Sequence, residues 1–141
     1  MGSKSDYLEN ELLDHVLSNA TWTGPATTYI GLLTTICNDA STSGSLSPGV
    51  EVTGGSYARV AYTNNATNWP AASGGAKSNG TAITFPTPSA NWGTVVGFIV
   101  ADVASGAGNI LYWGAITPNK TINNGDPAPY FAVGDLDITE D

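Results

Sequence analysis

The sequence predicts a mainly β protein: an antiparallel β-sandwich or jelly-roll-like domain with one N-terminal α-helix. Apolar residues recur at helical spacing only near the N-terminus, and short apolar runs separated by turn residues fill the rest of the chain. Charged residues make up only 11% of the chain, well below the share in ordinary soluble domains. The length of 141 residues fits one core. We expect a helical arm over residues 1–24 and a β-sandwich domain over residues 25–141.

The predicted helix covers residues 5–20. Its apolar side chains repeat at three- and four-residue spacing and form one stripe: Leu8, Leu12, Leu13, Val16, Leu17 and Ala20. Ser5 or Asp6 can cap the first turn, and Gly24-Pro25 prevents any continuation. A helix of this length is marginal alone in water, so its stripe must pack on the β domain or on a neighbouring subunit.

Short strands are predicted after the helix. Residues 28–35 are apolar on both faces and indicate a buried strand. Residues 38–55 are a long loop rich in Ser and Gly, residues 56–63 alternate as a strand does, and residues 64–77 form a second loop.

The second half of the chain predicts further strands. Residues 94–103 are the most hydrophobic run and should form the central strand, which is paired in a hairpin with residues 110–116. Shorter strands are expected at residues 80–85 and, at an edge, residues 119–123. The last strand should present one face and contain a bulge at glycine: Tyr130, Ala132, Leu136 and Ile138, with Gly134.

The composition argues against catalysis and against a bound metal. His15 and Cys37 are the only residues of their kinds, whereas a zinc site usually needs four ligands. None of the glycine-rich pieces has the order of a phosphate-binding loop, so they are read as turns. Most acids lie at the chain ends, where no glycosidase-like carboxylate pair is expected. We predict no enzyme activity, no catalytic, cofactor-binding or metal-binding residue and no cofactor, with His15 a surface or packing residue.

The net charge of −8 bears on partners. The four basic residues are scattered, which predicts no nucleic-acid partner: Lys4, Arg59, Lys77 and Lys120. No apolar run reaches the length that spans a bilayer, so no membrane partner is expected. Acids crowd both ends of the chain: Asp6, Glu9, Glu11 and Asp14, then Asp135, Asp137, Glu140 and Asp141. These clusters are read as solvated faces, with a docking surface for a basic patch or a cation site as alternatives.

Aromatic residues allow a second kind of function. Trp22, Trp69, Trp92 and Trp113 could form a platform that stacks on sugar rings, or they could fill the core and oligomer contacts. We expect Trp92 in the core or at its rim, and Trp69 to be exposed or at an interface.

Short motifs follow one another along nearly the whole chain. They are SDYLEN (5–10), LLDHV (12–16), YIGL (29–32), EVTGGSYAR (51–59), FP (85–86), WGTV (92–95), NILYWG (109–114), KTINNGD (120–126) and FAVGDLDI (131–138). In this order they resemble a family of small virion proteins of tailed bacteriophages, described as tail fibre-like, capsid cement or decoration proteins. The resemblance implies a β-sandwich structural protein with no catalytic residues. The chain departs from the family's pattern at residues 36–39 and in the loop that follows.

The body predicted here is compact and has no coiled-coil or repetitive shaft, which favours a capsid cement protein. Such a protein is made in the host cytoplasm, binds the major capsid protein on the outer capsid surface of the virion and stabilises the shell. A tail or tail-fibre structural component is the second reading, and a carbohydrate-binding module the third. The lone amphipathic helix and the low charge predict a homo-oligomer, a trimer before a dimer.

Overall fold

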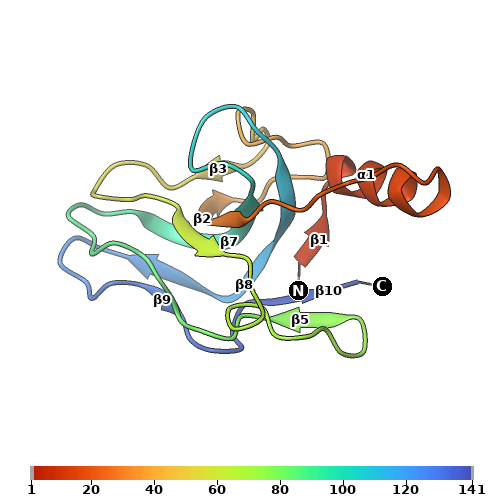
Figure 1. Cartoon of the computed structure of the whole chain (residues 1–141). Coiled ribbons are helices and arrows are strands. Elements are labelled where there is room, and N and C mark those ends of the chain that lie inside the picture. The colour runs from red at the N-terminus through yellow and green to blue at the C-terminus, as the bar shows by residue number, and fades with distance from the viewer. Residues whose placement is uncertain (1, 141) are drawn as a thin grey trace.

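Antiparallel strands dominate the structure, a computed structural model that describes residues 2–140 (Figure 1). Six of them form the main sheet in the order β1-β8-β7-β2-β3, with β4 also paired to β2. In chain order these are β1 (Gly2–Lys4), β2 (Thr27–Thr35), β3 (Val50–Glu51), β4 (Val60–Thr63), β7 (Gly93–Ala101) and β8 (Ile110–Ile122). The central position expected for residues 94–103 is confirmed, because β7 lies between β8 and β2.

Two small sheets form a second layer. One pairs β5 (Ala76–Ser78) with β10 (Asp137–Thr139), and the other pairs β6 (Ile83–Thr84) with β9 (Tyr130–Phe131). Figure 1 shows these strands below the main sheet. Apolar side chains from both layers join one buried cluster, which includes Ile30, Leu32, Phe98 and Val100 above and Ile83, Phe85, Leu136 and Ile138 below. The mainly β class with a single helix is therefore confirmed.

The central strands are apolar on both faces because both faces are covered. The outer face of β2 and β7 carries a smaller cluster of buried side chains: Leu33, Cys37, Ile99, Ala101 and Ile110. Leu46, from the long loop between β2 and β3, packs against this cluster. The long loop therefore covers this face of the sheet, and this covering role accounts for its length.

The prediction of a separate edge strand at residues 119–123 is wrong, because residues 119–122 are the end of β8. This strand is 13 residues long and pairs with the nine residues of β7 from Gly93↔Ile122 to Ala101↔Ile110. The partner of β7 changes from Lys120 at Val95 to Ala115 at Gly97, so the intervening residues of β8 bulge outward. Pro118 lies in this bulge and resembles a strand end in the sequence.

The prediction of one continuous last strand is also wrong. Residues between β9 and β10 form a turn, in which Ala132 N donates to Asp135 Oδ2 at 3.1 Å and Gly134 has a φ of +83°. The turn separates side chains that were expected on one face: Tyr130 is 65% exposed, whereas Leu136 and Ile138 are buried. The two remaining strand predictions are shorter in the structure, where only Val60–Thr63 and Ile83–Thr84 are extended in a sheet.

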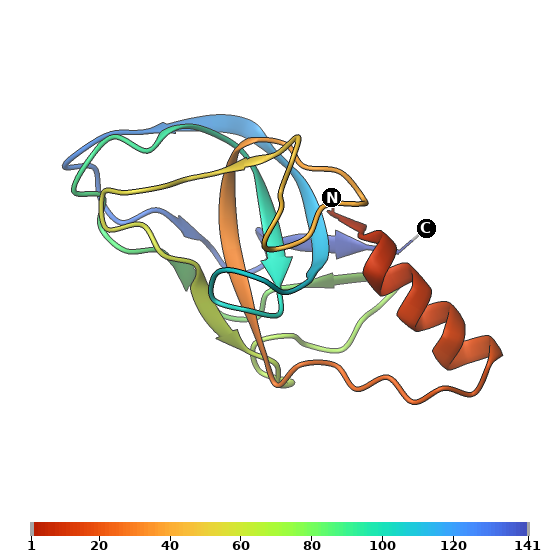
Figure 2. The ribbon, with the colours of Figure 1, turned by 90° about the horizontal axis from the view of Figure 1, so that it is seen from above.

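The helix α1 (Asp6–Leu17) projects from the body as an arm, and the following segment runs back toward β2 (Figure 2). The predicted cap is confirmed, because Ser5 Oγ accepts from Leu8 N at 3.4 Å. The helix ends before Gly24-Pro25, since Ser18 N bonds Asp14 O and Asn19 adopts a φ of +55°. No helix among residues 2–140 is long and apolar enough to cross a membrane.

Candidate interaction site

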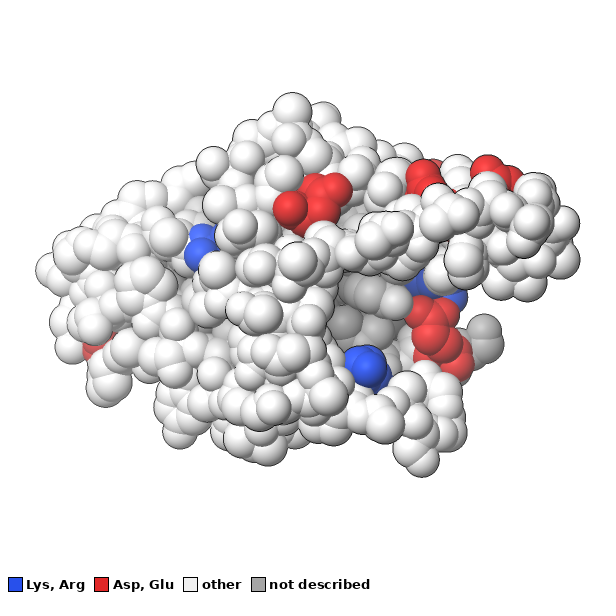
Figure 3. All heavy atoms as spheres, viewed as in Figure 1, with Lys and Arg blue, Asp and Glu red and all other residues white. Residues whose placement is uncertain are grey.

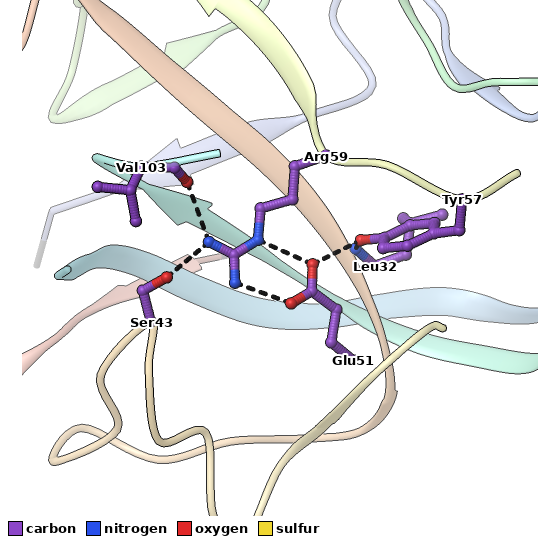
Figure 4. Close-up of polar contacts among 6 residues, drawn as sticks. All are labelled: Leu32, Ser43, Glu51, Tyr57, Arg59 and Val103. Atoms are coloured by element: carbon purple, nitrogen blue, oxygen red, sulfur yellow. Dashed lines mark hydrogen bonds and ion pairs between the residues drawn. The ribbon is translucent and has the colours of Figure 1, made fainter. Parts of the chain in front are cut away.

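A buried charged cluster explains the EVTGGSYAR motif (Figure 4). Arg59 Nε and Nη2 donate to the two carboxylate oxygens of Glu51, each at 2.8 Å. Arg59 Nη1 donates to Ser43 Oγ at 2.7 Å and to Val103 O at 3.0 Å. The Arg59 side chain is only 4% exposed, and all three of its nitrogens are used. The cluster therefore joins the loops after β2 and β7 to the segment before β4, and four of the five N–H donors of the guanidinium are used within the fold.

A tyrosine completes this cluster. Tyr57 OH donates to Glu51 Oε1 at 2.8 Å and accepts from Leu32 N at 2.8 Å. Burial, together with the negative charge of Glu51, holds the pKa of Tyr57 well above its ordinary value. Gly31 makes room for the carboxylate, since a Cβ there would lie 2.8 Å from Glu51 Oε1. The chemistry of the cluster is that of a structural tie.

The apolar stripe of α1 is buried at one end only. Leu8 is 2% exposed, but Leu13 is 56%, Val16 72% and Leu17 77% exposed. The stripe therefore begins against the body and continues beyond it. Four acidic side chains lie on the same helix: Asp6, Glu9, Glu11 and Asp14. Figure 3 shows acidic side chains along this arm and a hollow beside it.

An apolar groove lies between the segment that follows α1 and the small β5–β10 sheet. It has a volume of about 700 Å³ and contains Trp22, Trp69 and Tyr112 in its walls. Trp69 is less exposed than expected: the ring is half-buried, packs edge-on against Tyr62 with the ring centroids 5.2 Å apart and donates from Nε1 to Asn64 Oδ1 at 2.9 Å. A role of this ring at an interface stays a prediction. Burial, with the charge of Glu140, raises the pKa of Tyr112 to about 12. Lys77 also lines the groove.

The structure does not bring the four tryptophans onto one surface. Trp92 is buried in the main core, as expected, with Nε1 donating to Gly55 O at 2.9 Å. Trp113 packs against the smaller cluster on the opposite face of the sheet. Only Trp22 and Trp69 share the groove, so a four-ring sugar platform is not formed.

The remaining residues that the sequence singled out have local roles. His15 is exposed, and its Nδ1–H donates to Ala20 O at 2.8 Å, which fits the expected surface or packing role. Cys37 is buried, and burial raises the pKa of its thiol to about 11. Among residues 2–140, no three His, Cys, Asp or Glu side chains gather as a potential metal site.

Three acidic side chains near the C-terminus also have hydrogen-bond or ion-pair partners within the chain. Ser78 Oγ donates to Asp137 Oδ1 at 3.0 Å, and Asp135 caps the turn between β9 and β10. Glu140 forms an ion pair with Lys4, which ties the last residues to β1. These carboxylates therefore contribute less free negative surface than the sequence suggests, whereas the arm keeps its acidic side chains.

A β body whose rare internal charges are consumed by structural contacts, and which projects an apolar arm, is typical of a protein that works by assembly. The chain belongs to the family described as "Podophage GP4 fiber I protein gp80", whose family model matches residues 3–139. It is therefore a structural component of a tailed-bacteriophage virion. The resemblance to phage virion proteins is thereby confirmed. No curated protein matches the chain.

Sequence reasoning missed two features of this site. The Glu51–Arg59 pair was not expected, although both residues lie in one motif on either side of a Gly-Gly turn, and Arg59 was read as one of several scattered cations. The groove was missed entirely, because its walls come from segments around residues 22–28, 64–77, 100, 111–112 and 138–140. No local pattern connects those segments.

Proposed function

We propose that the protein is a structural component of the phage tail fibre, with no enzymatic activity. The observation that carries this proposal is the extent of the family match, which covers residues 3–139. The match includes the arm, the buried charged cluster and the strands of both layers. The word "fiber" in the family's description therefore refers to a model that spans residues 3–139, and we extend that role to this chain.

The contacts in the body support a role in assembly. The buried Arg59–Glu51 pair and the Lys4–Glu140 pair at the surface use two of the four basic side chains. What the body offers to other proteins is thus mainly apolar, hydroxyl and amide surface. Such a surface suits many weak contacts that hold a particle together, and it does not by itself supply the acid, base or nucleophile that catalysis uses.

The direct test is to locate the protein on the particle. Phages that carry an epitope tag after the C-terminal residue are labelled with gold-conjugated antibody and viewed by electron microscopy. Gold on the tail fibres, with impaired adsorption of particles that lack the protein, is the expected result. Gold spread over the head contradicts the fibre assignment.

The second candidate is a capsid cement protein on the outer capsid surface that binds the major capsid protein. One observation favours it: among residues 2–140 the only helix has 12 residues, so this part of the chain contains no coiled-coil shaft. A cement protein stabilises the shell because it binds the intact lattice and not its separated subunits. Particles that lack a cement protein should release DNA at a lower temperature than wild type, whereas loss of a fibre component should leave that temperature unchanged.

A further inference from the structure

The exposed apolar surface is concentrated on the arm. Six large hydrophobic side chains are exposed in the described part of the chain, and three of them lie on two turns of α1: Leu13, Val16 and Leu17. The other three lie elsewhere: Val50 is on β3, and Tyr130 and Val133 are on β9 and in the turn that follows it. A contiguous apolar patch on an otherwise polar surface marks an interaction site. The arm therefore needs a partner that removes this stripe from water.

The groove has the chemistry to receive such a stripe. Many of its lining residues are small, so a helix can approach closely: Gly24, Ala66, Ala71, Ala72, Gly75 and Ala76. Its principal side-chain amide is already used, because Asn64 Oδ1 accepts from Thr28 and Trp69 and Asn64 Nδ2 donates to Pro25 O at 2.8 Å. A polar ligand such as a sugar would find few open hydrogen-bonding partners there. An apolar side chain has no hydrogen bond to water that the groove would need to replace.

The charges of arm and groove are complementary. Glu9, Leu13 and Val16 are spaced by four and three residues, so this carboxylate lies on the same helix face as the exposed stripe. Lys77 lines the groove and has no ion-pair partner among residues 2–140. The other charged side chain in the groove, Glu140, is paired with Lys4. A helix that is apolar and acidic on one face thus matches a groove that is apolar and carries Lys77, a cation that no side chain of residues 2–140 pairs with.

We propose that the groove of one copy binds the α1 arm of a second copy of this chain, with Leu13, Val16 and Leu17 on its apolar walls and Glu9 beside Lys77. The exposed stripe does not line the groove of its own copy. Each copy therefore gives one arm and receives one arm, and when the giver and the receiver are different neighbours the contact is head-to-tail and forms a ring if the rotation between copies closes. A trimer closes it with three identical contacts. This contact is independent of whether the protein sits on the fibre or on the capsid.

The first experiment removes the stripe without disturbing the fold. Purified wild-type protein should have the mass of a closed oligomer by size-exclusion chromatography with light scattering, against 14.4 kDa for one copy. Val16→Gln should weaken self-association by about tenfold or more, because burying a valine or leucine side chain is worth at least that much. Val133→Gln is the matched control, because Val133 is also a largely exposed valine, at 64%, but lies in the turn after β9. The control should assemble as wild type does.

The second experiment tests the pairing of arm and groove. Glu9→Lys and Lys77→Glu should each weaken association, and the double variant should recover it, because the swap restores the opposite charges. Circular dichroism checks that the helix persists in every variant. A wild-type protein that is monomeric at every accessible concentration overturns the proposal. So does an oligomer that survives Val16→Gln, or a double variant that associates no better than either single one.

Discussion

The Arg59 cluster and the α1 arm invert the usual placement of residues. In the cluster, charged side chains are buried: Arg59 is 4% exposed and bonds to both oxygens of Glu51. On the arm, apolar side chains are exposed, and Leu17 reaches 77%. The buried charges are tolerated because every nitrogen of the guanidinium has a partner within the chain. The exposed leucines have no such partner among residues 2–140, which is why we look for one in a second molecule.

The difference teaches which region serves the fold and which serves assembly. Disturbing the cluster should lower the free energy of unfolding of each copy. Disturbing the distal arm should leave that energy almost unchanged and should alter association only. The changes below test this division from the largest expected effect to the smallest.

Arg59→Met should destabilise the fold most. It removes the partner of a carboxylate that is only 17% exposed, and an unpaired charge of this kind costs about 3–5 kcal/mol. Urea denaturation of the variant measures the loss. Lys120→Met, which changes an exposed lysine on β8, is the control and should stay within about 0.5 kcal/mol of wild type. Equal stabilities of the two variants would show that the ion pair is not a structural tie.

Gly31→Ala should disturb the same cluster by steric crowding, because it removes no hydrogen bond or charge. The new Cβ would lie 2.8 Å from both Glu51 Oε1 and Ile99 Cγ1, so the sheet or the carboxylate must shift. Overpacking of this kind costs about 1–3 kcal/mol. Gly24→Ala is the control, because its Cβ would meet only the Trp22 ring at an ordinary 3.6 Å. Thermal unfolding followed by circular dichroism compares the two, and a Gly31→Ala protein as stable as the control would contradict the close packing.

Tyr57→Phe should cost about 1–3 kcal/mol at neutral pH, because Leu32 N loses its acceptor and Glu51 loses a donor. The variant should also change the response to alkali. The pKa of Tyr57 is raised in the folded state, so the unfolded chain releases its proton first, near pH 10. The unfolded state then binds fewer protons than the native state, and the free energy of unfolding falls as pH rises above about 10.

Stability measured against pH for wild type and variant checks the sign. The decline of the wild-type protein should be steeper than that of Tyr57→Phe, because the phenylalanine has no proton to lose. Parallel curves would show that Tyr57 ionises as readily in the folded state as in the unfolded chain.

Ser5→Ala should have the smallest effect, about 1 kcal/mol, since it removes the N-cap of α1. Ser5 also donates to Ile110 O, so the change loosens the root of the arm on β8. Ser3→Ala, at an exposed position of β1, is the control. Denaturation of both variants measures the difference. If Ser5→Ala proves as costly as Arg59→Met, the division between a structural body and an attached arm fails.

Periodic segments were predictable because their pattern is local. The stripe from Leu8 to Leu17 predicts a helix by its spacing, and the apolar run of β7 predicts a central strand by its length and composition. Two strand predictions failed at turn residues. Pro118 lies inside β8 and does not end the strand, whereas Gly134 lies in a turn that separates β9 from β10. In both places the outcome depends on the opposite strand, whose pairing no local window contains.

For the site, the sequence alone established the scarcity of catalytic side chains, the acidic arm and the phage family that the motifs indicate. Tertiary structure alone decided that Arg59 is consumed by Glu51, that the helix stripe runs past the body after Leu8, and that a groove with Lys77 opens beside it. The physical reason is that composition and spacing belong to the chain. Burial instead depends on which distant segments approach, and the walls of this groove come from five stretches that only folding brings together.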